Sequence, residues 1–168
     1  MSKFQDILKG GDLRSIGKAN EIVGMVNNQT AFDELFEGLT HPDRKVVMRT
    51  ADAMEKITLG ESTYLQKHRA ALLDLCQRAK DIELKWHLAL LVSRLSLTRE
   101  ELENTWNLLT KWVTDKKESK IVRVNSMQGL FNLLQQHPEL SRDFNMTLAE
   151  IEKEQIASLN ARIRKLRF

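Results

Sequence analysis

Apolar residues recur along most of this chain at the spacing of an α-helix. In one segment they occupy the i, i+4, i+7 and i+11 positions of a helix face: Leu102, Trp106, Leu109 and Val113. The same spacing returns over residues 46–57 and 122–133, and no short window alternates convincingly between apolar and polar positions. The pattern therefore predicts an all-α protein built from amphipathic helices.

Turn-forming residues separate these periodic segments. Examples are Gly10-Gly11, Asn27-Asn28 and His137-Pro138, and Thr98 with Glu101 has the spacing of a capping box. We predict helices over residues 2–9, 13–26, 29–39, 43–58, 62–79, 82–96, 99–114, 119–136, 139–154 and 158–167. The short connections between them make each helix antiparallel to the one before.

A basic residue that follows an aliphatic or small one recurs early in four of the apolar stretches. These residues are Lys18, Arg49, Lys85 and Arg123, at spacings of 31, 36 and 38 residues. A period in this range predicts helical pairs stacked side by side, since one pair cannot bury its apolar face alone.

Two of these stretches resemble the second helix of a HEAT/armadillo repeat, in which small residues follow the basic one. They are Val-Met-Arg-Thr-Ala-Asp-Ala-Met over residues 47–54 and Ile-Val-Arg-Val-Asn-Ser-Met over 121–127, with a looser copy over 84–91. The whole chain resembles small bacterial HEAT-repeat proteins without an assigned chemistry. The resemblance implies a right-handed α-solenoid of about four to five hairpins. It implies one domain over residues 1–168, with the basic helix 158–168 as the last partial repeat.

Charge is concentrated at the C-terminus. The net charge is +3, but residues 158–168 hold four basic residues and no acid, leaving 22 basic against 23 acidic residues elsewhere. A nearly neutral body argues against a general affinity for nucleic acid. The lone Cys76 fits a reducing cytoplasm, and no apolar run is long enough to span a membrane.

No pattern of residues indicates catalysis or a bound metal. The chain has no HExxH, CxxC, GxSxG or phosphate-binding glycine motif, and its four histidines are not spaced as metal ligands. Cys76 lies in an apolar run and is expected to be buried. We therefore expect no enzyme activity, no cofactor and no metal.

The leading hypothesis is a scaffold that binds a protein or peptide partner on its concave face. The candidate residues are Arg49, Lys85, His87, Arg123 and Asn125. The resemblance also offers a structural role for the basic residues, in which each bonds an aspartate of the preceding turn, as Asp12 and Asp43 are placed to do. Both roles stay open.

The alternative hypothesis is a nucleic-acid binder of the DNA-repair type, with a basic concave surface. Its candidates are the basic tail of Arg162, Arg164, Lys165 and Arg167 and a stacking tryptophan. Trp106 is expected in the core and Trp112 partly exposed, while either Trp86 or His87 should face the groove. An accessory subunit for a cofactor protein is a third possibility, resting on fold analogy alone.

Overall fold

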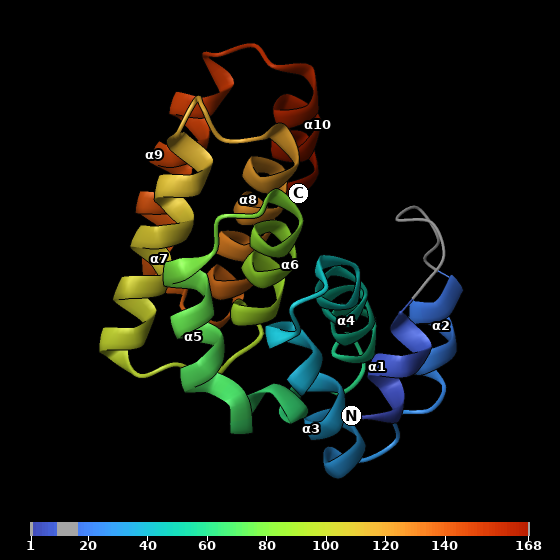
Figure 1. Cartoon of the computed structure of the whole chain (residues 1–168). Helices are drawn as coiled ribbons and strands as arrows, with labels where there is room; N and C mark the ends of the chain where they lie inside the picture. Colours follow the sequence, from blue (N-terminus) through green and yellow to red (C-terminus); the bar gives the residue numbers. More distant parts are fainter. Residues whose placement is uncertain (1, 10–16, 168) are drawn as a thin grey trace. The chain divides into compact units, whose positions relative to one another are not determined.

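The computed structural model describes residues 2–9 and 17–167, and within them every regular element is a helix (Figure 1). The all-α prediction is confirmed. Contacts group the helices into two compact units, residues 1–68 and 69–168. The single domain over 1–168 stays a prediction. Gly10-Gly11, Asp12 and the start of the helix predicted over 13–26 lie outside the described residues.

The first unit contains two helical hairpins. Its elements are α1 (Lys3–Leu8), α2 (Gly17–Val23), α3 (Gln29–Phe36), the 3-10 helix η1 (Glu37–Thr40), α4 (Arg44–Ile57) and the 3-10 helix η2 (Ser62–His68). Helix α1 pairs with α2 and α3 with α4, and contacts between α2 and α4 and between α1 and α3 stack the hairpins. Phe4, Phe32 and Met54 are fully buried between them.

The second unit contains three hairpins. Its elements are α5 (Arg69–Arg78), α6 (Ile82–Val92), α7 (Arg99–Thr114), α8 (Lys120–Gln136), the 3-10 helix η3 (Pro138–Leu140), α9 (Ser141–Glu152) and α10 (Ala157–Leu166). Helices α6, α8 and α10 pack side by side as an inner layer, and α5, α7 and α9 form an outer layer against them (Figure 1). Leu88 and Leu130 are fully buried, as expected for a shared core.

Local sequence explains where these helices begin. The side chains of Asn28, Asp43 and Ser119 each accept a hydrogen bond from a backbone N–H in the first turn of the following helix. Thr98 and Glu101 form the predicted capping box at the start of α7. Since these caps satisfy otherwise unpaired N–H groups, the sequence alone places most helix starts within a residue or two.

One glycine sets the distance between α6 and α8. A Cβ atom at Gly129 would lie 2.6 Å from the carbonyl oxygen of Ala89, so a side chain at this position would force the two backbones apart. Glycine therefore lets α8 approach α6 closely, and this contact holds two of the three inner helices in register.

Candidate functional site

The first two basic residues of the repeat pattern bond the end of α1. Lys18 Nζ donates to the carbonyl oxygen of Lys9 over 2.7 Å, and Arg49 Nη1 donates to that of Leu8 over 2.6 Å. Cations are favourable there because the last carbonyls of a helix lack backbone partners and carry partial negative charge. Arg49 is only 4% exposed, so its guanidinium lies inside the first unit.

The other two basic residues each bond a carboxylate in the turn between the two helices of the next hairpin. Lys85 Nζ lies 2.6 Å from Glu118 Oε2, just before α8. Arg123 makes a two-pronged pair with Glu154, before α10, over 3.0 and 2.8 Å, and its Nε donates to the carbonyl oxygen of Val113 over 2.7 Å. The bonds from Arg123 hold the pKa of Glu154 below its usual range. Both carboxylates thus come from the turn within the next hairpin, at the two positions where the sequence places no aspartate six residues before the basic residue.

The other two candidates for the concave face, His87 and Asn125, differ in how far they are buried. His87 is buried on α6, while the neighbouring Trp86 is only half-buried, so Trp86 is the one of the pair that reaches the surface. Asn125 is half-buried on α8 and its amide donates to the carbonyl oxygen of Ile121 over 2.9 Å. Partner binding by Arg49, Lys85, His87, Arg123 and Asn125 stays a prediction.

Three other aromatic and sulfur side chains selected from the sequence are all buried. Trp106 is 5% exposed and lies in the core, as expected. The partial exposure expected for Trp112 is wrong, because this ring is 6% exposed and the Lys85 ammonium lies 5.5 Å from its centroid. Cys76 is buried as expected, and burial raises the pKa of its thiol.

A row of side-chain hydrogen bonds crosses the inner layer of the second unit. Arg162 on α10 donates to the Gln128 amide oxygen over 2.6 Å, and the Gln128 amide donates to Asn132 over 3.0 Å. The Asn132 amide then donates to Ser93 Oγ over 2.9 Å. This polar row links α10, α8 and α6, and its residues were not among those selected from the sequence, with the exception of Arg162.

The polar row is part of a larger surface that faces away from the outer helices. On α8, the stripe Ile121, Asn125, Gln128 and Asn132 follows i, i+4, i+7 and i+11 and is exposed or half-buried, opposite the fully buried Leu130. The matching stripes contribute Ile82 and Trp86 from α6, and Ser158, Arg162 and Lys165 from α10. We call these nine residues the inner surface. Ser93, the polar-row residue at the C-terminal end of α6, is itself only 1% exposed.

The basic tail lies on α10. Arg162 belongs to the polar row, and Arg167 Nη1 donates to Glu152 Oε1 over 3.0 Å. Arg164 and Lys165 are exposed near the C-terminal end of the helix, where positive charge is favourable to the helix itself. The described part of the tail is thus helical, and two of its four basic residues contact the protein's own side chains.

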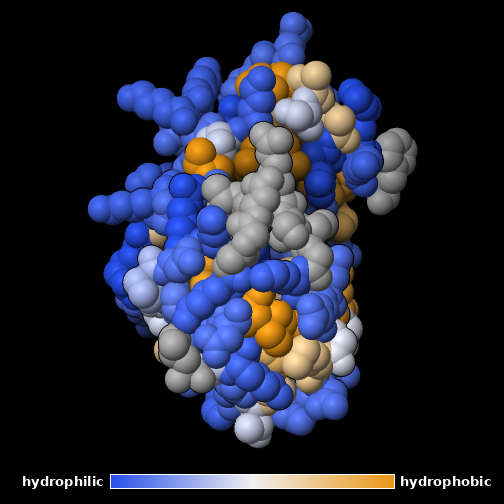
Figure 2. Space-filling model, turned by 45° about the vertical axis from the view of Figure 1, so that its right-hand side comes forward, coloured by the Kyte–Doolittle hydropathy of each residue, from blue (hydrophilic) through white to orange (hydrophobic). Residues whose placement is uncertain are grey.

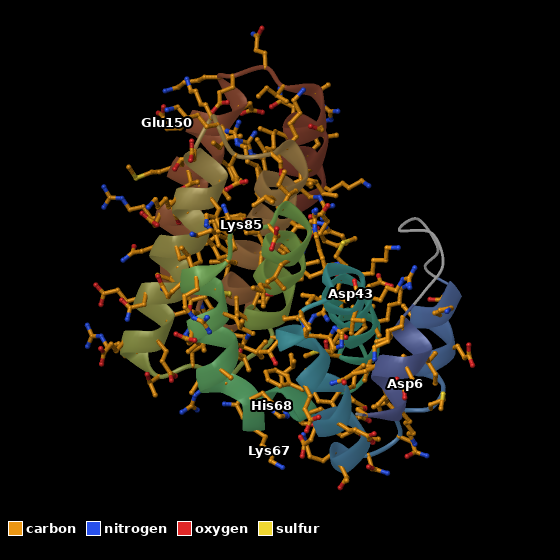
Figure 3. All side chains as sticks on the ribbon, in the orientation of Figure 1. Asp6, Asp43, Lys67, His68, Lys85 and Glu150 are labelled. Atoms are coloured by element: carbon orange, nitrogen blue, oxygen red, sulfur yellow. The ribbon has the colours of Figure 1, made fainter. Side chains whose placement is uncertain are left out.

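A polar cluster in the first unit joins α3 to η2. Asp33 accepts hydrogen bonds from Gln29 and His68, over 2.8 and 2.6 Å, and another from Lys67. The His68 ring stacks on Phe36, with centroids 3.9 Å apart. Lys67 and His68 lie together at one end of this unit (Figure 3). Burial raises the pKa of Asp33, but the hydrogen bonds from Lys67, Gln29 and His68 outweigh it and lower the pKa from 3.8 to about 2.

The lowered pKa of Asp33 predicts a loss of stability in acid. A carboxyl group with a lower pKa in the folded state stabilises the fold above its unfolded pKa, and this contribution disappears as pH falls from about 4 to about 2. We expect it to be about 1–2 kcal/mol, since Asp33 is partly exposed to solvent. Urea unfolding measured across this pH range should show a shallower pH dependence for Asp33→Asn than for the wild type. Equal slopes for the two proteins would contradict the assignment.

A groove lies on the outer layer of the second unit, between the N-terminal half of α7 and the segment η3–α9. Its volume is about 760 Å³. Its apolar side chains are Leu97, Leu102, Trp106 and Leu140, and its polar lining includes Glu103, Asp143 and Glu139. We call it the outer groove. Sequence reasoning assigned Trp106 to the core and did not identify this groove, because η3 and α7 meet only in the folded chain.

Within residues 2–9 and 17–167, no three histidine, cysteine, aspartate or glutamate side chains gather as a metal site would require. The helices of the same residues include none that is both long and apolar enough to cross a bilayer.

Comparison with known proteins identifies the repeat class. A family model described as a HEAT repeat domain matches residues 11–166, which is nearly the whole chain. No curated protein and no solved structure matches it. The matched span includes all the hairpins from α2 to α10. The chain therefore belongs to the HEAT repeat domain family.

Proposed function

We propose that this protein is a non-catalytic scaffold that binds an extended segment of a partner protein on its inner surface. The helical-repeat fold supports a scaffold, because stacked helices offer a long surface whose side chains vary without changing the core. The observation that carries the proposal is the polar row, which crosses the three inner helices rather than running along one of them.

The polar row is suited to a peptide backbone. A primary amide has two N–H donors and two acceptor lone pairs, and the contacts within the row use one donor each from Gln128 and Asn132. The row fixes the orientation of both amides and leaves one N–H of each and the second lone pair of each oxygen for a partner. An extended chain offers N–H and C=O groups that bond such donors and acceptors.

Apolar side chains further along the same surface provide the contact area. Ile82 and Ile121 are 46% and 47% exposed at the N-terminal ends of α6 and α8, and Trp86 is half-buried one turn along from Ile82. On the face drawn in Figure 2, apolar patches are interspersed with hydrophilic residues. Exposed aliphatic and aromatic residues that share a surface with polar side chains are typical of protein-binding surfaces.

The proposal predicts which substitutions weaken binding. Peptides selected from a random display library on the wild-type chain should bind about tenfold more weakly to Ile121→Asp and to Gln128→Leu. The matched control is Leu59→Asp, which alters a 74% exposed residue in the first unit and should leave binding unchanged. Binding should also shift the indole N–H resonance of Trp86, while the buried Trp112 serves as an internal reference.

Three outcomes would contradict the proposal. Selected peptides that bind both inner-surface variants as well as the wild type would place binding elsewhere. An equal loss in Leu59→Asp would indicate unspecific hydrophobic contact. Tight binding of random duplex DNA at about 150 mM salt, lost steeply as salt rises, would favour the nucleic-acid hypothesis, because released counterions dominate such binding.

A further inference from the structure

The outer groove combines an apolar floor with acidic walls. Leu102 and Trp106 come from α7 and Leu140 from η3, and these side chains, together with Leu97, form the floor. A volume of about 760 Å³ falls in the range of sites that hold several side chains or a small ligand. The groove lies on the outer helices, whereas the inner surface lies on α6, α8 and α10, so the two are separate sites.

The charges of the groove favour a cation. Glu103, Glu139 and Asp143 line it, against Arg99 and the His137 ring, whose Nδ1 lies 3.5 Å from Glu139. Negative charge therefore exceeds positive charge around the groove, on a chain whose net charge is +3. A groove opposite in sign to the rest of the molecule attracts positively charged partners selectively.

One carboxylate is held in place by the floor itself. The indole Nε1–H of Trp106 donates to Asp143 Oδ2 over 2.5 Å, and the Trp106 and Phe144 rings meet in an edge contact, with centroids 6.4 Å apart. This bond fixes the Asp143 carboxylate at the border between the apolar floor and the acidic wall. A lysine or arginine side chain fits such a border, because its aliphatic stem covers apolar surface while its charged end reaches a carboxylate.

We propose that the outer groove binds a basic, amphipathic helical segment of a partner protein. Leucine-like side chains of the segment pack on Leu102, Trp106 and Leu140, and lysine or arginine side chains one turn away pair with Glu103 and Asp143. The occupant is a helix in a groove, which presents apolar and basic residues at i and i+3 or i+4. This site does not depend on the inner surface.

The test uses the whole chain and two synthetic peptides. One contains leucine and lysine at helical spacing, and the other has the same sequence with every lysine replaced by glutamate. We expect the lysine peptide to bind the wild type, to shift the indole N–H resonance of Trp106, and to leave those of Trp86 and Trp112 in place. The glutamate peptide should not bind.

The variant for this test is the double change Glu103→Gln and Asp143→Asn. It removes two charges, while the asparagine oxygen can still accept the hydrogen bond from Trp106. The dissociation constant for the lysine peptide should rise about tenfold or more. The matched control is Glu150→Gln, which removes one charge from the same helix α9 at a position 68% exposed and outside the groove (Figure 3). Thermal melts of all variants verify folding.

Each alternative result would overturn the assignment. A shift of the indole N–H resonance of Trp86 instead of that of Trp106 would place the peptide on the inner surface. This result would overturn the assignment to the outer groove and leave the proposed function untouched. An equal loss of binding in Glu150→Gln would indicate diffuse attraction to acidic residues. Equal binding of the lysine and glutamate peptides would show that charge does not determine binding to the groove. Self-association of the wild type that is lost in the double variant would make a second copy of the chain the occupant.

Discussion

Replacing Arg123 by alanine is expected to lower the free energy of unfolding by about 3–5 kcal/mol, the largest loss we expect at any charged residue. Arg123 is 2% exposed, and it bonds both the carbonyl oxygen of Val113 and the carboxylate of Glu154. Alanine would leave that carboxylate, whose side chain is 13% exposed, without its partner. It would also leave a buried helix-end carbonyl unpaired and a cavity where the side chain lay.

Urea unfolding followed by circular dichroism measures this loss. The matched control is Arg167→Ala, which breaks an arginine–glutamate pair with Glu152 whose side chains are 42% and 43% exposed. We expect this control to cost less than about 1 kcal/mol, because exposed ion pairs contribute little. Similar losses for the two variants would show that burial does not decide the strength of the Arg123 pair.

Replacing Trp106 by alanine should also cost about 3–5 kcal/mol. The ring is 5% exposed, packs against Phe144 and donates a hydrogen bond to Asp143, so the change removes a large buried surface together with one polar contact. It leaves a cavity beneath the outer groove that the surrounding helices can fill only in part.

Trp86→Ala is the appropriate comparison for Trp106→Ala. Trp86 is half-buried on the inner surface, and we expect its loss to cost about 1–2 kcal/mol, because less of its area is removed from water. Urea unfolding of both variants under the same conditions shows which of them loses more stability. A loss below about 1 kcal/mol for Trp106→Ala would mean that the ring does not carry the packing of α7 on α9.

The fold was predictable because its determinants are local. Helical periodicity, the capping box at Thr98 and Glu101 and the N-cap at Asp43 are all written within a few residues, and the structure has the helices close to their predicted positions. The predicted helices over 29–39, 62–79 and 139–154 differ in that each contains a 3-10 segment. Before the last of these, Pro138 lacks the N–H that would continue α8, and the 3-10 turn Pro138–Leu140 leads into α9.

The candidate sites were less predictable because their contacts join distant parts of the sequence. Glu154 lies 31 residues from Arg123, and His68 lies 35 residues from Asp33. Periodicity finds the basic residues of the repeats but does not say which carboxylate each one meets. The error at Trp112 has the same origin, since Lys85, from another helix, lies against this ring. The polar row and the outer groove likewise exist only once neighbouring hairpins are stacked.

The direction of the ion pairs in the second unit has a consequence for synthesis. Lys85 pairs with a carboxylate 33 residues further along the chain, and Arg123 pairs with one 31 residues further along. During synthesis each basic residue therefore leaves the ribosome before the carboxylate that pairs with it. A hairpin in this unit is completed only when the next turn has emerged, and duplicating one internal hairpin would supply both the cation and the carboxylate that its neighbours require.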